Sequence, residues 1–135
     1  MSENNYQELI DAAVAVREKA YAPYSKYQVG AALLGKSGRI YSGCNVENAS
    51  YGATICAERV AAVKAVSEGE TEFLALAVVA DGKEPGSPCG ICRQFLAEFG
   101  INMKLILLNL EGKKIESTLE QYLPAAFGAK YLGKR

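Results

Sequence analysis

The feature that most constrains the fold is the run from Phe73 to Ala80, which contains no polar residue. A strand with one solvated face alternates apolar and polar residues, whereas a strand covered on both faces reads as a continuous apolar run. A turn-rich segment (81–88), a helical pattern (90–99) and another apolar run (104–108) follow it. Strand, helix and strand in that order imply a right-handed crossover and parallel pairing. We therefore predict a sheet with helices on both of its faces.

The remaining segments complete a mixed sheet of about five strands. Residues 7–20 repeat apolar side chains at helical spacing, and residues 29–34 and 40–44 flank a turn at 36–38, which predicts a β-hairpin. A loop rich in Asn and Gly (45–54) leads to a helix over residues 57–66. Thr118 and Gln121 predict a capping box for a short helix that Pro124 interrupts. We predict an α/β fold, a three-layer α/β/α sandwich, in a single domain over residues 1–135.

The charges and one missing residue type exclude several classes of protein. The chain has no histidine, so Ser-His-Asp and Cys-His catalysis and Cys/His zinc fingers are excluded. Lys+Arg and Asp+Glu both number 15, which argues against a surface that tracks phosphates. The apolar runs are too short for a membrane span, and the polar N-terminus is unlike a secretion signal. We expect a cytoplasmic protein with neither nucleic-acid nor membrane partners.

Three of the four cysteines stand at the starts of two predicted helices. Cys56 precedes the helix at 57–66, and Cys89 and Cys92 stand at the start of the helix at 90–99. A helix N-terminus favours thiolate over thiol. Two such ends that face each other would hold three thiolates around one zinc ion. A zinc ion with three protein ligands keeps its fourth position for water, as in catalytic sites.

Charged residues beside these cysteines suit such a site. Glu58 follows Cys56 by two residues, and a carboxylate beside a zinc-held water can act as a general acid and base. Because three thiolates leave a zinc site with a net negative charge, nearby positive charge should compensate. Arg59 lies about one helical turn after Cys56 and could donate hydrogen bonds to the sulfurs. Arg93 is the other candidate for this compensation.

Two other interpretations of the cysteines remain open. Cys89-Gly90-Ile91-Cys92 at a helix start is also typical of a thioredoxin-type redox pair. Cys44 as a fourth ligand would instead close the site into a structural zinc site. However, Cys44 ends an apolar strand, where a free cysteine usually packs as a small apolar side chain.

Together these residues resemble the zinc-dependent cytidine deaminases, specifically the small-subunit class in which three cysteines hold the metal. The resemblance extends from about residue 22 to residue 127. It rests on Ala22-Pro23-Tyr24-Ser25-Lys26, Val29-Gly30-Ala31-Ala32, Gly43-Cys44-Asn45-Val46-Glu47-Asn48-Ala49-Ser50, Cys56-Ala57-Glu58-Arg59 and Ser87-Pro88-Cys89-Gly90-Ile91-Cys92-Arg93-Gln94.

The resemblance implies hydrolytic deamination of free cytidine and deoxycytidine to uridine and deoxyuridine, with release of ammonia, in pyrimidine salvage. One zinc ion per chain, held by Cys56, Cys89 and Cys92, would carry a hydroxide that attacks carbon 4 of the pyrimidine. Glu58 would protonate ring nitrogen 3 and then the departing amine. The fold implied is the cytidine deaminase-like sandwich.

The resemblance also implies a set of substrate contacts. Asn45 and Glu47 would bind the ribose hydroxyls, and Ala57 would contact the nucleoside. Tyr27 occupies a position where the family often has phenylalanine, and Phe127 resembles an aromatic residue that covers the base, typically from a neighbouring subunit. Members of this class are usually homotetramers with sites near the subunit contacts.

Two other activities compete with this one. A deaminase of aminonucleoside antibiotics (the blasticidin type) would share the zinc motifs, although the pair Asn45 and Glu47 favours a plain ribose. A thiol oxidoreductase would use the pair Cys89 and Cys92 and would need no metal.

Overall fold

The computed structural model describes residues 3–133 and contains one five-stranded sheet in the order β2-β1-β3-β4-β5. β3 and β4 pair in parallel, and the other neighbours pair antiparallel. The mixed five-stranded sheet predicted from the sequence is therefore confirmed. The strands are β1 Val29–Gly35, β2 Ile40–Cys44, β3 Phe73–Ala80, β4 Lys104–Asn109 and β5 Lys114–Thr118.

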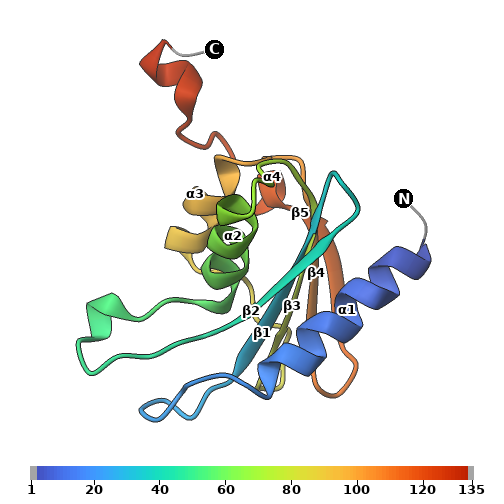
Figure 1. The fold of residues 1–135 in the computed structure, drawn as a ribbon, viewed down its shortest axis with the longest axis vertical. Helices are drawn as coiled ribbons and strands as arrows, with labels where there is room; N and C mark the ends of the chain where they lie inside the picture. The colour runs from blue at the N-terminus through green and yellow to red at the C-terminus, as the bar shows by residue number, and fades with distance from the viewer. Residues whose placement is uncertain (1–2, 134–135) are drawn as a thin grey trace.

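Helices cover both faces of the sheet (Figure 1). α1 (Glu3–Arg17) lies on one face, and α2 (Ala57–Ser67) and α3 (Gly90–Ala97) lie on the other, which confirms the three-layer prediction. The short α4 (Leu119–Tyr122) begins at the predicted capping box, formed by Thr118 and Gln121. Two 3₁₀ turns, η1 (Tyr51–Ala53) and η2 (Ala129–Leu132), lie in projecting segments. Within residues 3–133, no helix is both long enough and apolar enough to cross a bilayer.

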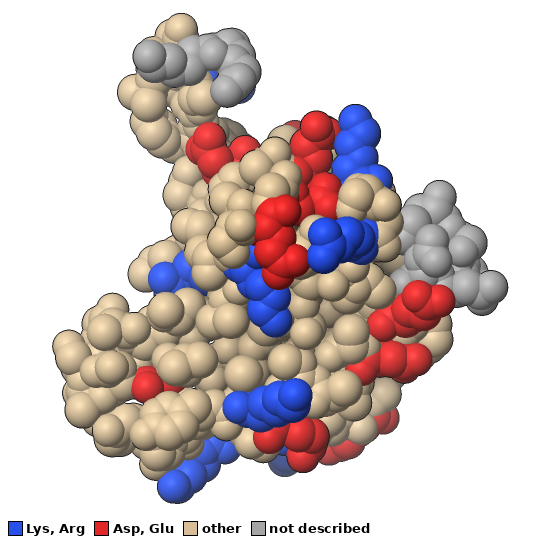
Figure 2. Space-filling view, viewed as in Figure 1, with Lys and Arg blue, Asp and Glu red and all other residues tan. Residues whose placement is uncertain are grey.

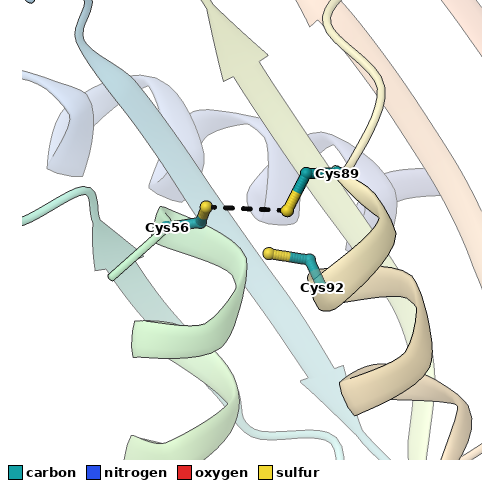
Figure 3. Close-up of side chains that lie close together, drawn as sticks. All are labelled: Cys56, Cys89 and Cys92. Atoms are coloured by element: carbon teal, nitrogen blue, oxygen red, sulfur yellow. Dashed lines mark hydrogen bonds between the residues drawn. The ribbon is translucent and has the colours of Figure 1, made fainter. Parts of the chain in front are cut away.

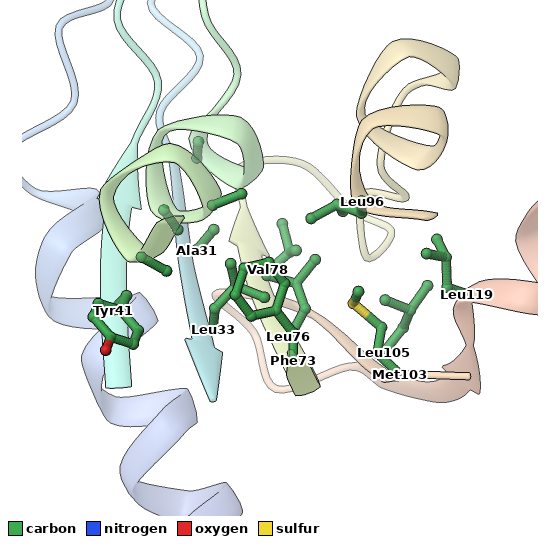
Figure 4. Close-up of a cluster of buried hydrophobic side chains, with 14 of the residues drawn as sticks. Ala31, Leu33, Tyr41, Phe73, Leu76, Val78, Leu96, Met103, Leu105 and Leu119 are labelled. Carbon is green, nitrogen blue, oxygen red and sulfur yellow. The ribbon is translucent and has the colours of Figure 1, made fainter. Parts of the chain in front are cut away.

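β3 is apolar throughout because each of its faces packs against a helical layer. Leu76 and Val78 belong to the cluster under α2 and α3 (Figure 4), and Ala77 and Val79 belong to the cluster under α1. All four side chains are at most 2% exposed. The strand buried on both faces that the apolar run predicted is therefore confirmed.

Two glycines allow the helices to approach the sheet closely. A Cβ on Gly30 would lie 2.0 Å from the carbonyl oxygen of Ala13 in α1. A Cβ on Gly43 would lie 2.5 Å from the backbone nitrogen of Ala61 in α2. Both contacts are with backbone atoms, so a larger residue at either position would separate a helix from the sheet.

The structure differs from the sequence prediction at several element boundaries. The helix expected over residues 7–20 runs from Glu3 to Arg17, because the chain turns at residues 18–20 to form a bridge between Tyr21 and Val46. The helix expected over 90–99 ends at Ala97 in a similar turn. β5 was not placed among the predicted strands, because its sequence is polar and its side chains are mostly exposed at the sheet edge.

Candidate active site

The N-termini of α2 and α3 bring three cysteines together (Figure 3). Cys56 is the N-cap of α2, Cys89 is the N-cap of α3, and Cys92 lies in the first turn of α3. Neither N-cap side chain makes a capping hydrogen bond with its own helix. The helix ends therefore position the sulfurs beside two sets of N-terminal amides, where a negative charge is stabilised.

The spacing of the sulfurs fits a zinc ion. The three Sγ atoms lie within 4.8 Å of one another, and the Sγ atoms of Cys56 and Cys89 are 3.9 Å apart. Tetrahedral coordination with Zn–S bonds of about 2.3 Å places two sulfurs about 3.8 Å apart. All three cysteines are free thiols, the form in which cysteine can ligate a metal once deprotonated. Cys44 does not belong to the group, so the closed four-cysteine site is not formed.

One side of the sulfur group opens into a cavity of about 420 Å³. Cys92 is fully buried, Cys56 is half-buried and Cys89 is exposed, so access is from the side of Cys56 and Cys89. Both of these cysteines line the cavity. The other predicted site residues that line it are Glu58, Tyr27, Asn45, Glu47 and Ala57.

Arg59 lies beside the thiols, where the prediction of charge compensation needs it. Its Nη2 is 3.8 Å from the Sγ of Cys56, while its Nε is buried without a hydrogen-bond partner among the described residues. Hydrogen bonds from Cys92 and Arg59 lower the pKa of Cys56 to about 5, although burial opposes them. The bond to Cys56, together with burial, raises the pKa of Cys92.

Arg93, the second candidate for charge compensation, has a different role in the structure. It donates hydrogen bonds to the carbonyl oxygens of Pro88 at 2.7 Å and Tyr122 at 3.0 Å, and to the hydroxyl of Ser87 at 3.2 Å. Its guanidinium also lies over the ring of Tyr122. Arg93 thus braces the loop before Cys89 against the end of α4, and its hydrogen bonds within the described residues go to oxygens and not to the cysteine sulfurs.

Glu58 is the buried carboxyl of the site. It lies in the first turn of α2, is 5% exposed and lines the cavity together with Cys56 and Cys89. Burial raises the pKa of Glu58 to about 7, and the neighbouring negative charge of Cys56 adds to this effect. A carboxyl with a pKa near neutrality can both accept and release a proton at physiological pH.

Asn45 holds the segment that forms one wall of the cavity. Its Nδ2 donates to the carbonyl oxygen of Tyr27 at 2.8 Å, and its Oδ1 accepts from the backbone nitrogen of Val29 at 2.9 Å. An amide has a second N–H and a second lone pair beyond these two bonds. From the sequence, a role in substrate binding and an ordinary turn were equally supported for Asn45; the two backbone partners in this segment were not predicted.

Glu47 also binds the segment before β1, at Tyr24 and Ser25. Its Oε1 accepts from the backbone nitrogens of Tyr24 at 3.0 Å and Ser25 at 3.1 Å, and its Oε2 accepts from the hydroxyl of Ser25. The hydrogen bond from the Ser25 hydroxyl is the main reason that the pKa of Glu47 lies below its usual value. Glu47 is therefore ionised and held at the rim of the cavity.

Phe127 lies away from the cavity of its own chain. It is 56% exposed on the C-terminal segment and stacks against Tyr131, and its carbonyl oxygen accepts a hydrogen bond from Gln94. The structure does not bring it together with the other predicted site residues. Its contact with the base from a neighbouring subunit stays a prediction.

The sequence analysis missed residues that supply the floor and rim of the cavity. Val78 and Ala80 at the end of β3, and Gly86 and Ser87 in the following loop, line it. Ligand sites of open α/β sheets lie beyond the carboxyl ends of strands, so the end of the apolar run was the signal that could have identified them.

Three clustered thiols that fit zinc, beside a buried carboxyl in an α/β/α sandwich, define a zinc-dependent hydrolytic enzyme. A family model described as "Cytidine and deoxycytidylate deaminase zinc-binding region" matches residues 3–108. The chain belongs to this family. The family predicted from the sequence, with zinc held by Cys56, Cys89 and Cys92, is therefore confirmed.

Individual relatives agree with the family assignment. The chain is 53% identical over 127 residues to a cytidine deaminase of Sporosarcina psychrophila, covering 93% of each chain. It is 54% identical over 125 residues to a cytidine deaminase of Halalkalibacterium halodurans, covering 92% of this chain and 95% of the relative. The crystal structure of cytidine deaminase from Burkholderia pseudomallei superposes with a TM-score of 0.88 at 45% identity, covering 94% of this chain and 100% of that one.

Proposed function

We propose that the protein hydrolyses free cytidine and deoxycytidine to uridine and deoxyuridine with release of ammonia, as a pyrimidine-salvage enzyme with one catalytic domain. The observation that carries the proposal is the placement of buried Glu58 in the same cavity as Cys56 and Cys89. A proton donor and acceptor thereby lies beside a metal-binding group at the floor of a cavity large enough for a small molecule. The names of the relatives supply the substrate class.

Glu58 moves the protons of this reaction. Zinc, when bound, supplies a Lewis acid that favours deprotonation of water at the site. As water adds at carbon 4 of the pyrimidine, Glu58 takes one of its protons and delivers it to ring nitrogen 3. Glu58 then takes the proton of the new hydroxyl on carbon 4 and delivers it to the amine, which leaves as ammonia when the carbon–nitrogen bond breaks and the carbonyl of the product forms. Because Glu58 is 5% exposed, bulk water has little access to its carboxyl group.

The cavity wall orients the nucleoside. We assign the ribose hydroxyls to Asn45 and Glu47, whose unused lone pairs and N–H group can bind a hydroxyl that is both donor and acceptor. Tyr27 and Ala57 line the space next to them. The presence of Asn45 and Glu47 in the cavity lining favours a plain ribose over an antibiotic substrate.

The proposed assembly is a homotetramer with sites near the subunit contacts. Apolar side chains are exposed on the projecting segments: Tyr21 is 57% exposed, Tyr51 76% and Leu132 63%. In Figure 2 the projection at the lower left, formed by the loops before β1 and after β2, is mostly uncharged. Large exposed apolar patches are typical of protein interfaces. The molar mass in solution tests this assembly.

The surface charges and the thiols support the remaining expectations. Basic and acidic side chains are interspersed on the face shown in Figure 2, so the described residues of that face form no basic groove of the kind that binds nucleic acid. Three free thiols that must bind metal need a reducing compartment, which supports the prediction of a cytoplasmic enzyme.

Ammonia release from cytidine by the zinc-loaded protein tests the proposed function. We expect turnover by the wild type and its loss after the metal is stripped with a chelator. Glu58→Gln should keep one zinc per chain but lose about 10²- to 10⁴-fold in kcat, because an amide cannot carry the proton. The exposed substitution Glu8→Gln is the matched control. Substantial turnover by Glu58→Gln would show that another group moves the proton.

A further inference from the structure

Asp81, the first residue after β3, joins two parts of the chain that are distant in sequence. Its Oδ1 accepts from the Nε of Arg17 at 3.0 Å and also from the Nη2 of Arg17. Its Oδ2 accepts from the backbone nitrogen of Gln28 at 3.0 Å. One carboxylate therefore binds the last residue of α1 and the residue that precedes β1.

Gln28 lies between two residues that line the cavity, Tyr27 and Val29. Asn45 binds the carbonyl oxygen of Tyr27 and the nitrogen of Val29, while Asp81 binds the nitrogen of Gln28. Three consecutive residues are thus fixed by two side chains. Asn45 faces the cavity, whereas Asp81 is not among the residues that line it.

The ion pair between Arg17 and Asp81 is shielded from solvent. The Arg17 side chain is 11% exposed and that of Asp81 is 26% exposed, whereas the ion pair between Lys113 and Glu84 is 54% and 76% exposed. Arg17 belongs to α1, which lies against the opposite face of the sheet from α2 and α3. A shielded pair is strongly disturbed when one partner is removed, because the other charge remains poorly solvated.

We propose that Asp81 and Arg17 are positioning residues for the substrate, which hold the backbone of Gln28 so that Tyr27 and Val29 form the cavity wall. This inference rests on the proposed function. It assigns part of the nucleoside affinity to a carboxylate outside the cavity and to α1, the helix on the opposite face of the sheet from the cysteines and Glu58. Glu58 and the cysteines stand on α2 and α3, so they remain in place when the pair is broken.

This separation predicts an effect on substrate binding and not on the chemical step. For Asp81→Ala we expect the KM for cytidine to rise about tenfold, the value of one charge-assisted hydrogen bond, while kcat stays within about twofold. The Kd of uridine, measured by calorimetry, should rise by a similar factor. Asp81→Asn keeps an oxygen that can accept from Gln28, so its effect should be smaller.

Control variants separate positioning from general loss of stability. Glu84→Gln lies in the same loop, breaks the exposed pair with Lys113 and should leave KM unchanged. Arg17→Lys keeps the charge but loses the forked geometry, so it should raise KM less than Asp81→Ala does. If Asp81→Ala does not fold, Asp81→Asn and Arg17→Lys carry the same test.

Each outcome decides the inference. A rise in both KM and the Kd of uridine at constant kcat supports it. If the wild type turns over cytidine while the variants keep its KM and uridine Kd, or lose kcat alone, the positioning role is wrong and the proposed function stands. If the wild type neither deaminates cytidine nor binds uridine, the proposed function is wrong and the inference falls with it.

Discussion

Gly43→Ala tests how closely the metal-binding helix must approach the sheet. A Cβ at residue 43 would lie 2.5 Å from the backbone nitrogen of Ala61 and 2.9 Å from the Cβ of Val60. Ordinary contacts between such atoms are about 3.5 Å or longer. Because the nearest obstacle is backbone, no rotamer change relieves the clash. α2 and β2 must separate by about 1 Å over the alanines that pack between them.

The expected cost follows from this separation. Overpacking of a well-packed core costs about 1–3 kcal/mol, and a clash with backbone belongs at the upper end of that range. With an unfolding entropy of about 2.1 cal/mol/K per residue, a loss of about 3 kcal/mol lowers the melting temperature of a chain of this length by about 10 °C. Thermal unfolding of the zinc-loaded protein at fixed protein concentration measures this change.

The same movement should weaken metal binding. Cys56 is the N-cap of α2, so a shift of the helix by about 1 Å displaces its sulfur from those of Cys89 and Cys92, whereas metal-ligand distances tolerate only about 0.2 Å. Competition with a chromogenic chelator should show faster loss of zinc. Gly52→Ala is the control, because a Cβ at residue 52 meets no atom within 4 Å. An unchanged melting temperature and zinc affinity in Gly43→Ala would refute the reasoning.

Two further predictions concern acid stability and the fourth cysteine. Burial alone would raise the pKa of Asp81, but bonds from Gln28 and Arg17 hold it below its usual value. The group therefore stabilises the fold above its unfolded pKa of about 3.9 and loses this contribution as pH falls through the lower folded value. In urea unfolding, the stability of Asp81→Asn should fall less than that of the wild type in this acid range; parallel curves would contradict this. Cys44→Ser should keep its zinc, measured by metal analysis, because Cys44 lies outside the sulfur group; metal-free protein would restore the closed site.

The sequence predicted those parts of the fold whose physics is local. The apolar run at Phe73–Ala80 predicted a strand covered on both faces and is one, and Thr118 with Gln121 formed the predicted cap. β5 was missed because an exposed edge strand has no buried face to impose an apolar pattern. Its contacts with β4, such as the ion pair between Lys104 and Glu116, are visible only once the register is known.

In the candidate site, too, the residues predicted correctly are those whose role depends on the local sequence. Cys56, Cys89 and Glu58 carry their chemistry in their residue types and in their places at helix starts. Arg93 was one of two candidates for compensating the thiolates, because it is next to Cys92, but in the structure it donates to the carbonyl oxygen of Tyr122 at the end of α4. That competing partner is 29 residues distant in sequence, and no local pattern reveals it.

The direction of the strands explains why the sulfurs meet. β2 and β3 both pair antiparallel with β1, so they run in the same direction although β1 separates them. The carboxyl ends of β2 and β3 therefore lie at the same end of the sheet. α2 follows β2 and α3 follows β3, and both helices pack on the same face of the sheet. Both helices therefore begin at that end of the sheet, with their N-terminal amides near each other. Asp81 binds the backbone of Gln28, and Asn45 binds that of Val29, the first residue of β1. The single strand β1 thus aligns the two metal-binding helices, and its first residue lines the cavity between them and the sheet.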